Sequence, residues 1–320
     1  QYFLRGFNLD HGTDFTTWID GIPMNLRTNA HGQGYMDLNS LIPEMVDRIE
    51  FGKGPYYADQ GDFSSAGYAR MTTRTKLTGF NNDSDKGFAR FEGGMFDYYR
   101  ALIANSNRVG QGDLLYAGEV NFYNGPWVVP ENGNKYNGII KYTLGDKDWQ
   151  VSLNGKAYYS HWIASNQIPL AELGNSLNPT CCDITGQNGY GKDGRFGSMS
   201  PSDGGVTSRY SGSINATSKG ENYKNELNLY ALYYGLDLYS DFTYFSANPY
   251  QGDQVWQHER RVQAGGNAEQ TWFNEVLGLD MENKLGVQLR YDNVHNLGVS
   301  NTYQRQPVLD NSYLPPSLYN

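Results

Sequence analysis

From residue 88 onward, hydrophobic and polar residues alternate one by one along several segments of the chain. In the segment Trp149–Tyr159, Leu153 belongs to the mostly apolar set of alternate positions, and Lys156 belongs to the polar set between them. A period of two residues places the two sets on opposite faces of a β-strand. A tilted strand crosses a lipid bilayer with ~9–11 residues, which matches the length of this segment. We therefore expect Leu153 to face lipid and Lys156 to face the interior of a β-barrel.

Nine segments are expected to form strands of this kind. They cover residues 88–95, 100–107, 114–125, 136–144, 149–160, 206–217, 222–244, 258–273 and 277–293. From the third strand onward, tight turns alternate with long connections, the longest of which is 161–205. Outer-membrane barrels have short periplasmic turns and long external loops. The alternation favours such a barrel over its alternative, a soluble β-sandwich.

An open sheet of nine strands would leave edge hydrogen bonds unpaired in lipid, which a bilayer does not tolerate. We therefore expect the chain to be part of a longer polypeptide that closes a wide barrel, such as the plugged ~22-stranded kind. The composition of 38 Gly and 26 Tyr with only 18% charged residues suits such strands. No apolar run approaches the ~20 residues of a membrane helix. The net charge of −9 argues against a nucleic-acid partner.

The first 75 residues or so follow a different pattern and are expected to form a small mixed α/β domain. Ser40–Val46 is predicted to be a short helix with Ser40 as its N-cap. Short strands are expected at Tyr2–Phe7, Thr16–Ile19 and Arg48–Phe51. The predicted organisation is this domain at 1–77, a linker at 78–87 and the barrel strands at 88–320.

Several motifs of the first domain occur together in one order. They are Arg5-Gly6-Phe7, Ile19-Asp20-Gly21-Ile22-Pro23, Val46-Asp47-Arg48-Ile49-Glu50, Lys53-Gly54-Pro55 and Gly61 with Ser65-Ala66-Gly67. In this order and spacing they resemble the C-terminal portion of the plug domain of TonB-dependent outer-membrane receptors of the siderophore-receptor type. The segment Tyr68–Met71 departs from the family pattern, because it lacks the usual apolar strand sequence.

The resemblance implies a transmembrane β-barrel of the 22-stranded type with a plug inside its lumen, in the outer membrane of a Gram-negative bacterium. It also implies TonB-dependent active transport of a scarce metal chelate, most often a ferric siderophore. The implied partners are TonB with its inner-membrane energising complex, the chelate and outer-membrane lipid. Neither a cofactor nor an enzyme activity is expected, since no nucleophile elbow, phosphate loop or zinc motif is found.

Two alternatives to chelate transport remain open. One is a passive porin or adhesin. The plug motifs argue against a porin, because a porin has an aqueous lumen and no N-terminal plug. The other is a direct receptor for a transition metal such as copper or nickel. The soft ligands for that role would be His11, His31, Met24, Met36 and the Cys181-Cys182 pair. No two histidines are spaced for one helix face, so no metal site is assigned. The cysteines are expected to form a vicinal disulfide or to remain free thiols in the long loop.

The resemblance also suggests site residues. Arg5 and Arg48 match the plug arginines that pair with barrel carboxylates, and we expect their partners beyond residue 320. Ligand contacts are expected from two plug loops, Asn8–Phe15 and Asn25–Tyr35. An arginine with tyrosine and histidine suits an anionic ferric chelate, because charge-assisted hydrogen bonds are strong. The candidate substrate-binding residues are His11, Asp14, Asn25, Arg27, His31 and Tyr35.

Overall fold

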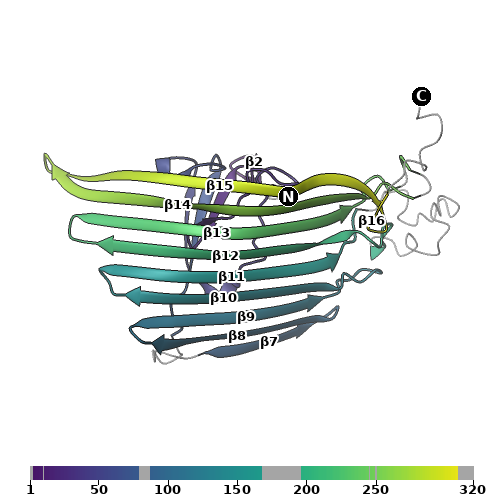
Figure 1. Cartoon of the computed structure of the whole chain (residues 1–320), viewed down its shortest axis with the longest axis horizontal. Coiled ribbons are helices and arrows are strands. Elements are labelled where there is room, and N and C mark those ends of the chain that lie inside the picture. The colour runs from purple at the N-terminus through teal and green to yellow at the C-terminus, as the bar shows by residue number, and fades with distance from the viewer. Residues whose placement is uncertain are drawn as a thin grey trace.

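The computed structural model describes residues 3–9, 11–78, 87–167, 196–244, 246–248 and 251–308. A large curved sheet carries a small N-terminal domain against one of its faces (Figure 1). Most of the predicted linker, and both Cys181 and Cys182, lie outside the described residues. Within the described ranges, no helix combines the length and the apolar character needed to cross a bilayer.

The N-terminal domain, called the plug domain below, contains two small sheets. A two-stranded sheet pairs β1 (Phe3–Leu4) with β2 (Phe7–Asn8). The second sheet has four strands in the order β4-β3-β6-β5, in which only the β3–β6 pair is parallel. The remaining elements are β3 (Phe15–Ile19), β4 (Ile22–Pro23), the 3-10 helix η1 (Pro43–Met45), β5 (Val46–Lys53), the 3-10 helix η2 (Ala58–Gln60) and β6 (Gly67–Thr73).

The plug domain differs from its prediction in two places. The predicted helix over Ser40–Val46 is only the 3-10 turn η1, whose N-cap is Ile42 rather than Ser40 and makes no side-chain capping bond. The predicted strand Tyr2–Phe7 is divided by a turn at Arg5 and Gly6, which have φ values of 53° and 83°. The segment Tyr68–Met71, which lacks the apolar family sequence, nevertheless lies in β6. The helical part of the described plug domain is thus limited to two 3-10 turns.

All nine predicted barrel strands are present, most of them longer than predicted. Together with one short strand they form a single antiparallel sheet in which every strand pairs with its neighbours in the chain. The strands are β7 (Phe88–Gly94), β8 (Tyr98–Val109), β9 (Gly112–Tyr123), β10 (Gly133–Gly145), β11 (Trp149–Ile163), β12 (Gly204–Lys219), β13 (Tyr223–Ser240), β14 (Val255–Val276), β15 (Leu279–Tyr303) and β16 (Gln306–Pro307).

Tight turns and long connections alternate along this sheet, as predicted. The tight turns lie at the left edge of the sheet in Figure 1, at 110–111, 146–148, 220–222 and 277–278. The strand ends that the longer connections 124–132, 164–203 and 241–254 join lie at the opposite edge. We call this opposite edge the long-loop end.

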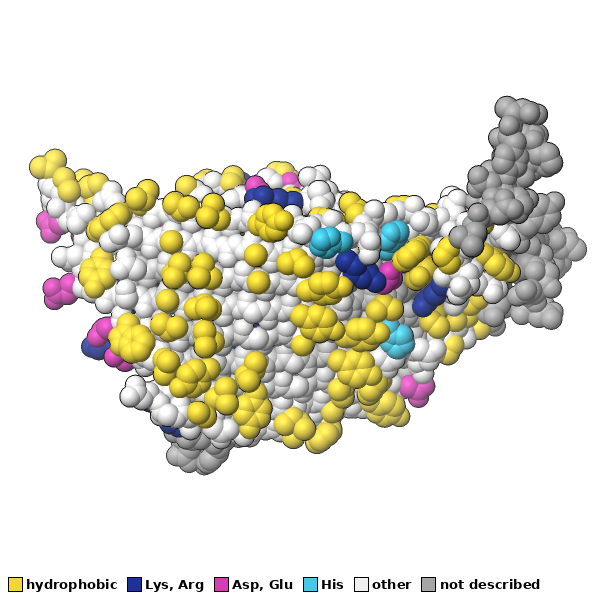
Figure 2. Space-filling view, in the orientation of Figure 1, with side chains coloured by type: hydrophobic (Ala, Val, Ile, Leu, Met, Phe, Trp, Pro, Cys, Tyr) yellow, Lys and Arg dark blue, Asp and Glu magenta, His cyan; other side chains and the backbone are white. Residues whose placement is uncertain are grey.

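The two faces of the sheet have opposite character. Leu153 is 50% exposed on the outer face, whereas Lys156 lies on the inner face and contacts the plug residue Asp20, so the predicted facing is confirmed. Hydrophobic side chains cover much of the outer face (Figure 2). They include Ile103, Ile140, Ile214, Leu229 and Leu289. The inner face carries many buried polar side chains, among them Glu119, Asn137, Lys141, Asn154, Arg209 and Asn228. A sheet of this kind is apolar outside and largely polar inside, as in membrane barrels.

The contact between plug domain and sheet is not wholly polar. Two clusters of buried apolar residues connect them, one around Ile42 and Met45 and one around Ile22 and Leu26. Their partners from the inner face are Leu102, Ala104, Leu115, Ala117 and Ile139 for the first cluster, and Tyr230, Leu232, Tyr234 and Leu236 for the second. Apolar packing therefore helps to hold the plug domain against the sheet.

Candidate functional site

The most buried ionic contact between plug and sheet centres on Asp20, in the turn between β3 and β4. Its carboxylate, 1% exposed, accepts hydrogen bonds from Lys141 Nζ at 3.2 Å and from Lys156 Nζ. Thr73 adds its backbone N–H at 2.9 Å and its hydroxyl at 2.7 Å. Burial disfavours the charged carboxylate, but Lys156 and Lys141 outweigh it and hold the pKa of Asp20 well below its usual range. Asp20 is therefore a buried anion that two sheet lysines neutralise.

The backbone of the same turn also binds the sheet. The carbonyl oxygen of Asp20 accepts hydrogen bonds from the side-chain amides of Asn215 at 2.9 Å and Asn228 at 3.3 Å. The next residue, Gly21, has a φ of 78°, and a Cβ there would lie 2.3 Å from Asn228 Nδ2. Only glycine fits both this backbone conformation and this close approach. The Asp-Gly pair of the motif thus serves docking to the sheet.

A second ionic contact joins η1 to the first strands of the sheet. The Glu44 carboxylate accepts two hydrogen bonds from Arg100, at 2.7 and 2.8 Å, and one from Arg90 at 3.3 Å. Hydrogen bonding from Arg100 lowers the pKa of Glu44. Arg100 also binds Glu119 on the neighbouring strand β9, so one guanidinium connects the plug with the inner face. A planar guanidinium suits such two-point binding of carboxylates.

In both contacts the plug supplies the carboxylate and the sheet supplies the cation. The predicted contacts concern plug arginines instead. Arg5 is exposed in the hairpin turn between β1 and β2. Arg48 lies 3.0 Å from Glu50 of its own strand, and its side chain is 65% exposed. Among the described residues, neither arginine forms an ion pair with the sheet. Their pairing with carboxylates beyond residue 320 stays a prediction.

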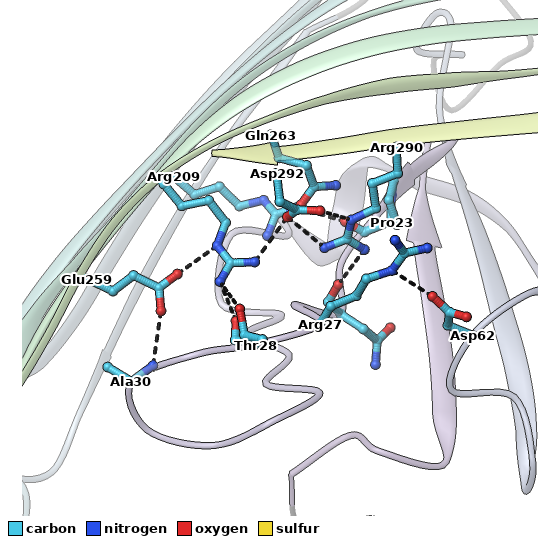
Figure 3. A network of polar contacts seen from close by, with 12 residues as sticks. Pro23, Arg27, Thr28, Ala30, Asp62, Arg209, Glu259, Gln263, Arg290 and Asp292 are labelled. Atoms are coloured by element: carbon cyan, nitrogen blue, oxygen red, sulfur yellow. Dashed lines mark hydrogen bonds and ion pairs between the residues drawn. The ribbon is translucent and has the colours of Figure 1, made fainter. Parts of the chain in front are cut away.

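The plug loop that contains Thr28 and Ala30 is held by strand β14 (Figure 3). The Ala30 backbone N–H donates to Glu259 at 3.0 Å, and Arg261 donates to the Thr28 hydroxyl at 2.9 Å. Arg261 also binds Glu259 at 2.6 Å and Asp292 of β15 at 3.0 Å. The side chains of Glu259 and Arg261 are 0% exposed. This buried network fixes the loop position relative to the sheet.

Three of the predicted substrate-binding residues meet near the long-loop end. The rings of His11 and His31 have centroids 5.5 Å apart, and those of His31 and Tyr35 are 5.9 Å apart. His31 Nδ1 lies 3.1 Å from the amide oxygen of Gln257, near the start of β14. Burial raises the pKa of the Tyr35 hydroxyl well above its ordinary value, so this residue is a neutral phenol at neutral pH. The two predicted loops therefore do come together. We call this region the plug apex.

The other three predicted residues have different surroundings. Asn25 is 1% exposed, and its side chain binds backbone groups of Gly12, Phe15 and Thr17, so it holds the loop instead of facing outward. Asp14 accepts hydrogen bonds from Ser65 and Thr13 within the plug. The predicted ligand contacts of Asn25 and Asp14 find no support in these positions.

Arg27 remains available to a ligand. It lies 2.7 Å from Asp62, but its side chain is 53% exposed. A guanidinium this exposed can exchange its carboxylate partner for another anion, because exposed ion pairs contribute little stability. In the part of the chain that the structure describes, no group of three or more His, Cys, Asp or Glu residues could hold a metal ion.

Comparison with known proteins places this architecture. Residues 1–68 match the family model described as the TonB-dependent receptor plug domain. No curated protein sequence gives a significant match to the chain. Among solved structures, the ferric citrate transporter FecA in its unliganded form is 12% identical, with a TM-score of 0.69 over 97% of this chain and 43% of FecA. The ferric-catecholate import receptor Fiu of E. coli K12 is 15% identical, with a TM-score of 0.64 over 96% of this chain and 47% of Fiu.

The copper transporter OprC also resembles the chain, with a TM-score of 0.60 at 12% identity over 91% of this chain and 40% of OprC. The chain thus spans less than half the length of each of these three solved proteins. At such low identities the likeness concerns the fold. The match of the first 68 residues adds the family of the N-terminal domain. This chain carries the plug domain of the TonB-dependent receptors, and its strands have the fold of their barrel.

Proposed function

We propose that the chain is part of a receptor that takes up a metal chelate across the outer membrane of a Gram-negative bacterium. The chelate that we propose first is a ferric siderophore. The observation that carries this proposal is the pairing of a plug domain with a sheet that is apolar outside and polar inside. The apolar outer face suits outer-membrane lipid. The polar inner face suits a lumen through which a hydrophilic solute passes once the plug moves.

The contacts between plug and sheet suit a plug that moves only when another protein complex supplies energy. Asp20 and Glu44 hold the plug through ion pairs that are buried or half-buried, and removal of one partner from a buried pair costs about 3–5 kcal/mol. Thermal motion alone rarely breaks several such contacts together. In the proposed cycle, TonB and its inner-membrane complex supply the energy, and the lysines and arginines of the inner face stay behind on the barrel wall.

The plug apex suits an anionic chelate that arrives at the long-loop end. Arg27, in the same plug loop, offers an exposed guanidinium, and His31 offers an imidazole beside the Tyr35 ring. This combination provides a charge-assisted hydrogen bond and aromatic contact for the chelator. The solved relatives FecA and Fiu are described as a ferric citrate transporter and a ferric-catecholate import receptor. Iron chelates are therefore the first ligands to test.

The test uses cells that express the full-length receptor in a strain without its own iron receptors. Uptake of radiolabelled iron is measured with a panel of siderophores, with and without a protonophore. We expect one chelate to be bound in both conditions but imported only when the proton gradient is intact. Import that continues after the gradient collapses would contradict active transport. Large single-channel conductance of the purified receptor would instead favour the passive porin.

A further inference from the structure

We propose that His11 and His31 form a two-imidazole binding site for a divalent transition metal at the plug apex. The proposal rests on the uptake of a metal chelate proposed above, and it makes the cargo a divalent metal with an incomplete chelator instead of a ferric siderophore. The two histidines come from separate plug loops, 20 residues apart by their numbers, and their ring centroids are 5.5 Å apart. Histidine nitrogens bind Zn²⁺ at about 2.0–2.1 Å, which places the centroids of two ligating rings about 5 Å apart. The observed separation is close to that value.

A hydrogen bond from the sheet prepares His31 for this role. An amide oxygen can only accept, so the Nδ1 atom that lies 3.1 Å from the Gln257 oxygen carries the proton. The other ring nitrogen, Nε2, then keeps its lone pair. Metal-binding histidines commonly donate their second ring N–H to such a partner, which fixes the tautomer and the ring orientation. Gln257 supplies this contact from β14.

A glycine in the loop of His31 lets the two rings approach each other. A Cβ at Gly32 would lie 2.9 Å from His11 Cδ2, which is closer than a side chain allows. Any residue larger than glycine would therefore push the His11 ring away from its place beside His31. Glycine thus stands at the position where His11 packs against the loop of His31.

The pair would leave coordination positions of the metal open. Within the described ranges no third His, Cys, Asp or Glu joins the two rings. Structural zinc sites are closed by four protein ligands, whereas a cargo must be released again. Imidazole ligands suit copper, nickel and zinc ions. Two imidazoles with open positions fit a divalent metal that keeps waters or part of its chelator when it binds.

The experiment measures Cu²⁺ and Ni²⁺ binding by the full-length receptor purified in detergent, by titration calorimetry and by electron paramagnetic resonance of the Cu²⁺ complex. We expect one site per receptor with hyperfine splitting from two nitrogen ligands. The double variant His11→Ala/His31→Ala should lose at least tenfold in affinity and lose this splitting. Gln257→Leu should weaken binding by about 10–100-fold, the usual effect of removing such a partner.

The matched control is His258→Ala/His295→Ala, which removes two histidines from β14 and β15 without touching the plug. This variant should bind Cu²⁺ like the unchanged receptor. If the nitrogen splitting is lost in this control but kept in His11→Ala/His31→Ala, the proposed site is wrong. The single variants His11→Gln and His31→Gln test the same point should the double variant fail to fold.

The proposed function can fail separately. Unchanged Cu²⁺ binding by the His11→Ala/His31→Ala receptor would overturn the imidazole site and leave energised chelate uptake intact. Iron uptake that ignores the proton gradient would overturn the transport proposal, whatever the outcome of the metal titration.

Discussion

The Asp20 carboxylate of the plug lies 3.2 Å from the Lys141 ammonium of β10, although the two residues are 121 positions apart in the chain. Both side chains are nearly inaccessible, with exposures of 1% and 4%. A buried charge of either sign needs its partner, because desolvation is not recovered otherwise. Removal of this contact therefore tests how firmly the plug is docked to the sheet.

Asp20→Asn should loosen the plug without unfolding the barrel. The change leaves Lys141 and Lys156 without their anion, and we expect the free energy of plug opening to fall by about 3–5 kcal/mol. Native-state hydrogen exchange at Thr73, whose N–H donates to Asp20, reports that opening directly. The control is Asp113→Asn, which breaks an exposed pair with Arg108 and should cost less than about 1 kcal/mol. Equal effects of the two variants would contradict the role of Asp20.

Leu153→Lys and Lys156→Leu should fail in different ways, because the two residues occupy opposite faces of β11. A lysine at position 153 would face lipid, and near the midplane such a charge costs about 2–4 kcal/mol. We expect poor insertion into lipid vesicles, measured by the heat-modifiable shift in gel mobility. Lys156→Leu should insert normally, because Lys141 still neutralises Asp20, but should raise hydrogen exchange in the plug. If Lys156→Leu inserted poorly and Leu153→Lys inserted normally, the two faces of the strand would be inverted.

The strands could be predicted from sequence because their signal is local. Each strand lies between lipid and a polar interior, so alternate residues such as Leu153 and Lys156 differ in character along a single segment. Tight turns and long loops likewise follow from the segment boundaries. The predicted helix at Ser40–Val46 failed because Pro43 begins only a single turn, and the apolar face of that turn packs on the sheet instead of extending a helix.

The contacts between plug and sheet could not be predicted in the same way. Asp20 stands in a recognised motif, but an Asp-Gly pair also marks an ordinary turn. Its lysines belong to strands far along the chain, and nothing local shows that they point at this turn. The plug arginines Arg5 and Arg48 matched a family pattern, yet the chain uses plug carboxylates for the contacts that the structure describes. The approach of His11 to His31 depended on the packing of two loops around Gly32.

Arg261→Met should displace the plug loop at Thr28 and Ala30. The variant leaves Glu259 buried without its cation, so we expect a loss of about 3–5 kcal/mol in the local stability of the loop. Chelate affinity should fall with it, since Arg27 and His31 flank this part of the loop. The adjacent Arg260 is a matched control, because it pairs with Asp237 and is 34% exposed. Arg260→Met should leave both affinity and hydrogen exchange at Ala30 nearly unchanged.

Arg27 and Asp62 should affect ligand binding in opposite directions. Arg27→Ala removes an exposed guanidinium, and the loss of a hydrogen bond to a charged group costs about 1.5–3 kcal/mol, or roughly tenfold or more in affinity. Asp62→Asn frees Arg27 from its 2.7 Å contact and should leave affinity equal or higher. Both are measured by fluorescence quenching with the chelate that supports growth. A loss of affinity in Asp62→Asn alone would remove Arg27 from the site.

Asp241, which follows β13 in the connection at the long-loop end, should make that connection sensitive to pH. The residue is 4% exposed, and its N–H donates to Asp203 at 3.0 Å. Burial and the negative charge of Asp203 raise the pKa of Asp241 from 3.8 to about 7. A pKa that is higher in the folded state means that folding favours the protonated form. The stabilisation is therefore complete below about pH 4 and is lost as pH rises through about 7.

Protection of the Tyr244 amide, which donates to Asp241 at 2.6 Å, should accordingly decrease between pH 5 and pH 8 after correction for intrinsic exchange. Asp241→Asn should weaken this pH dependence, since the amide cannot ionise and the carboxylate of Asp203, whose pKa burial also raises, is the titratable neighbour that remains. Asp146 in a tight turn is the control of opposite sign, because backbone hydrogen bonds from Asp148 and Trp149 lower its pKa. Its contribution is already complete above pH 4, so Asp146→Asn should not alter the profile. A pH profile that persists unchanged in Asp241→Asn would assign the effect to another group.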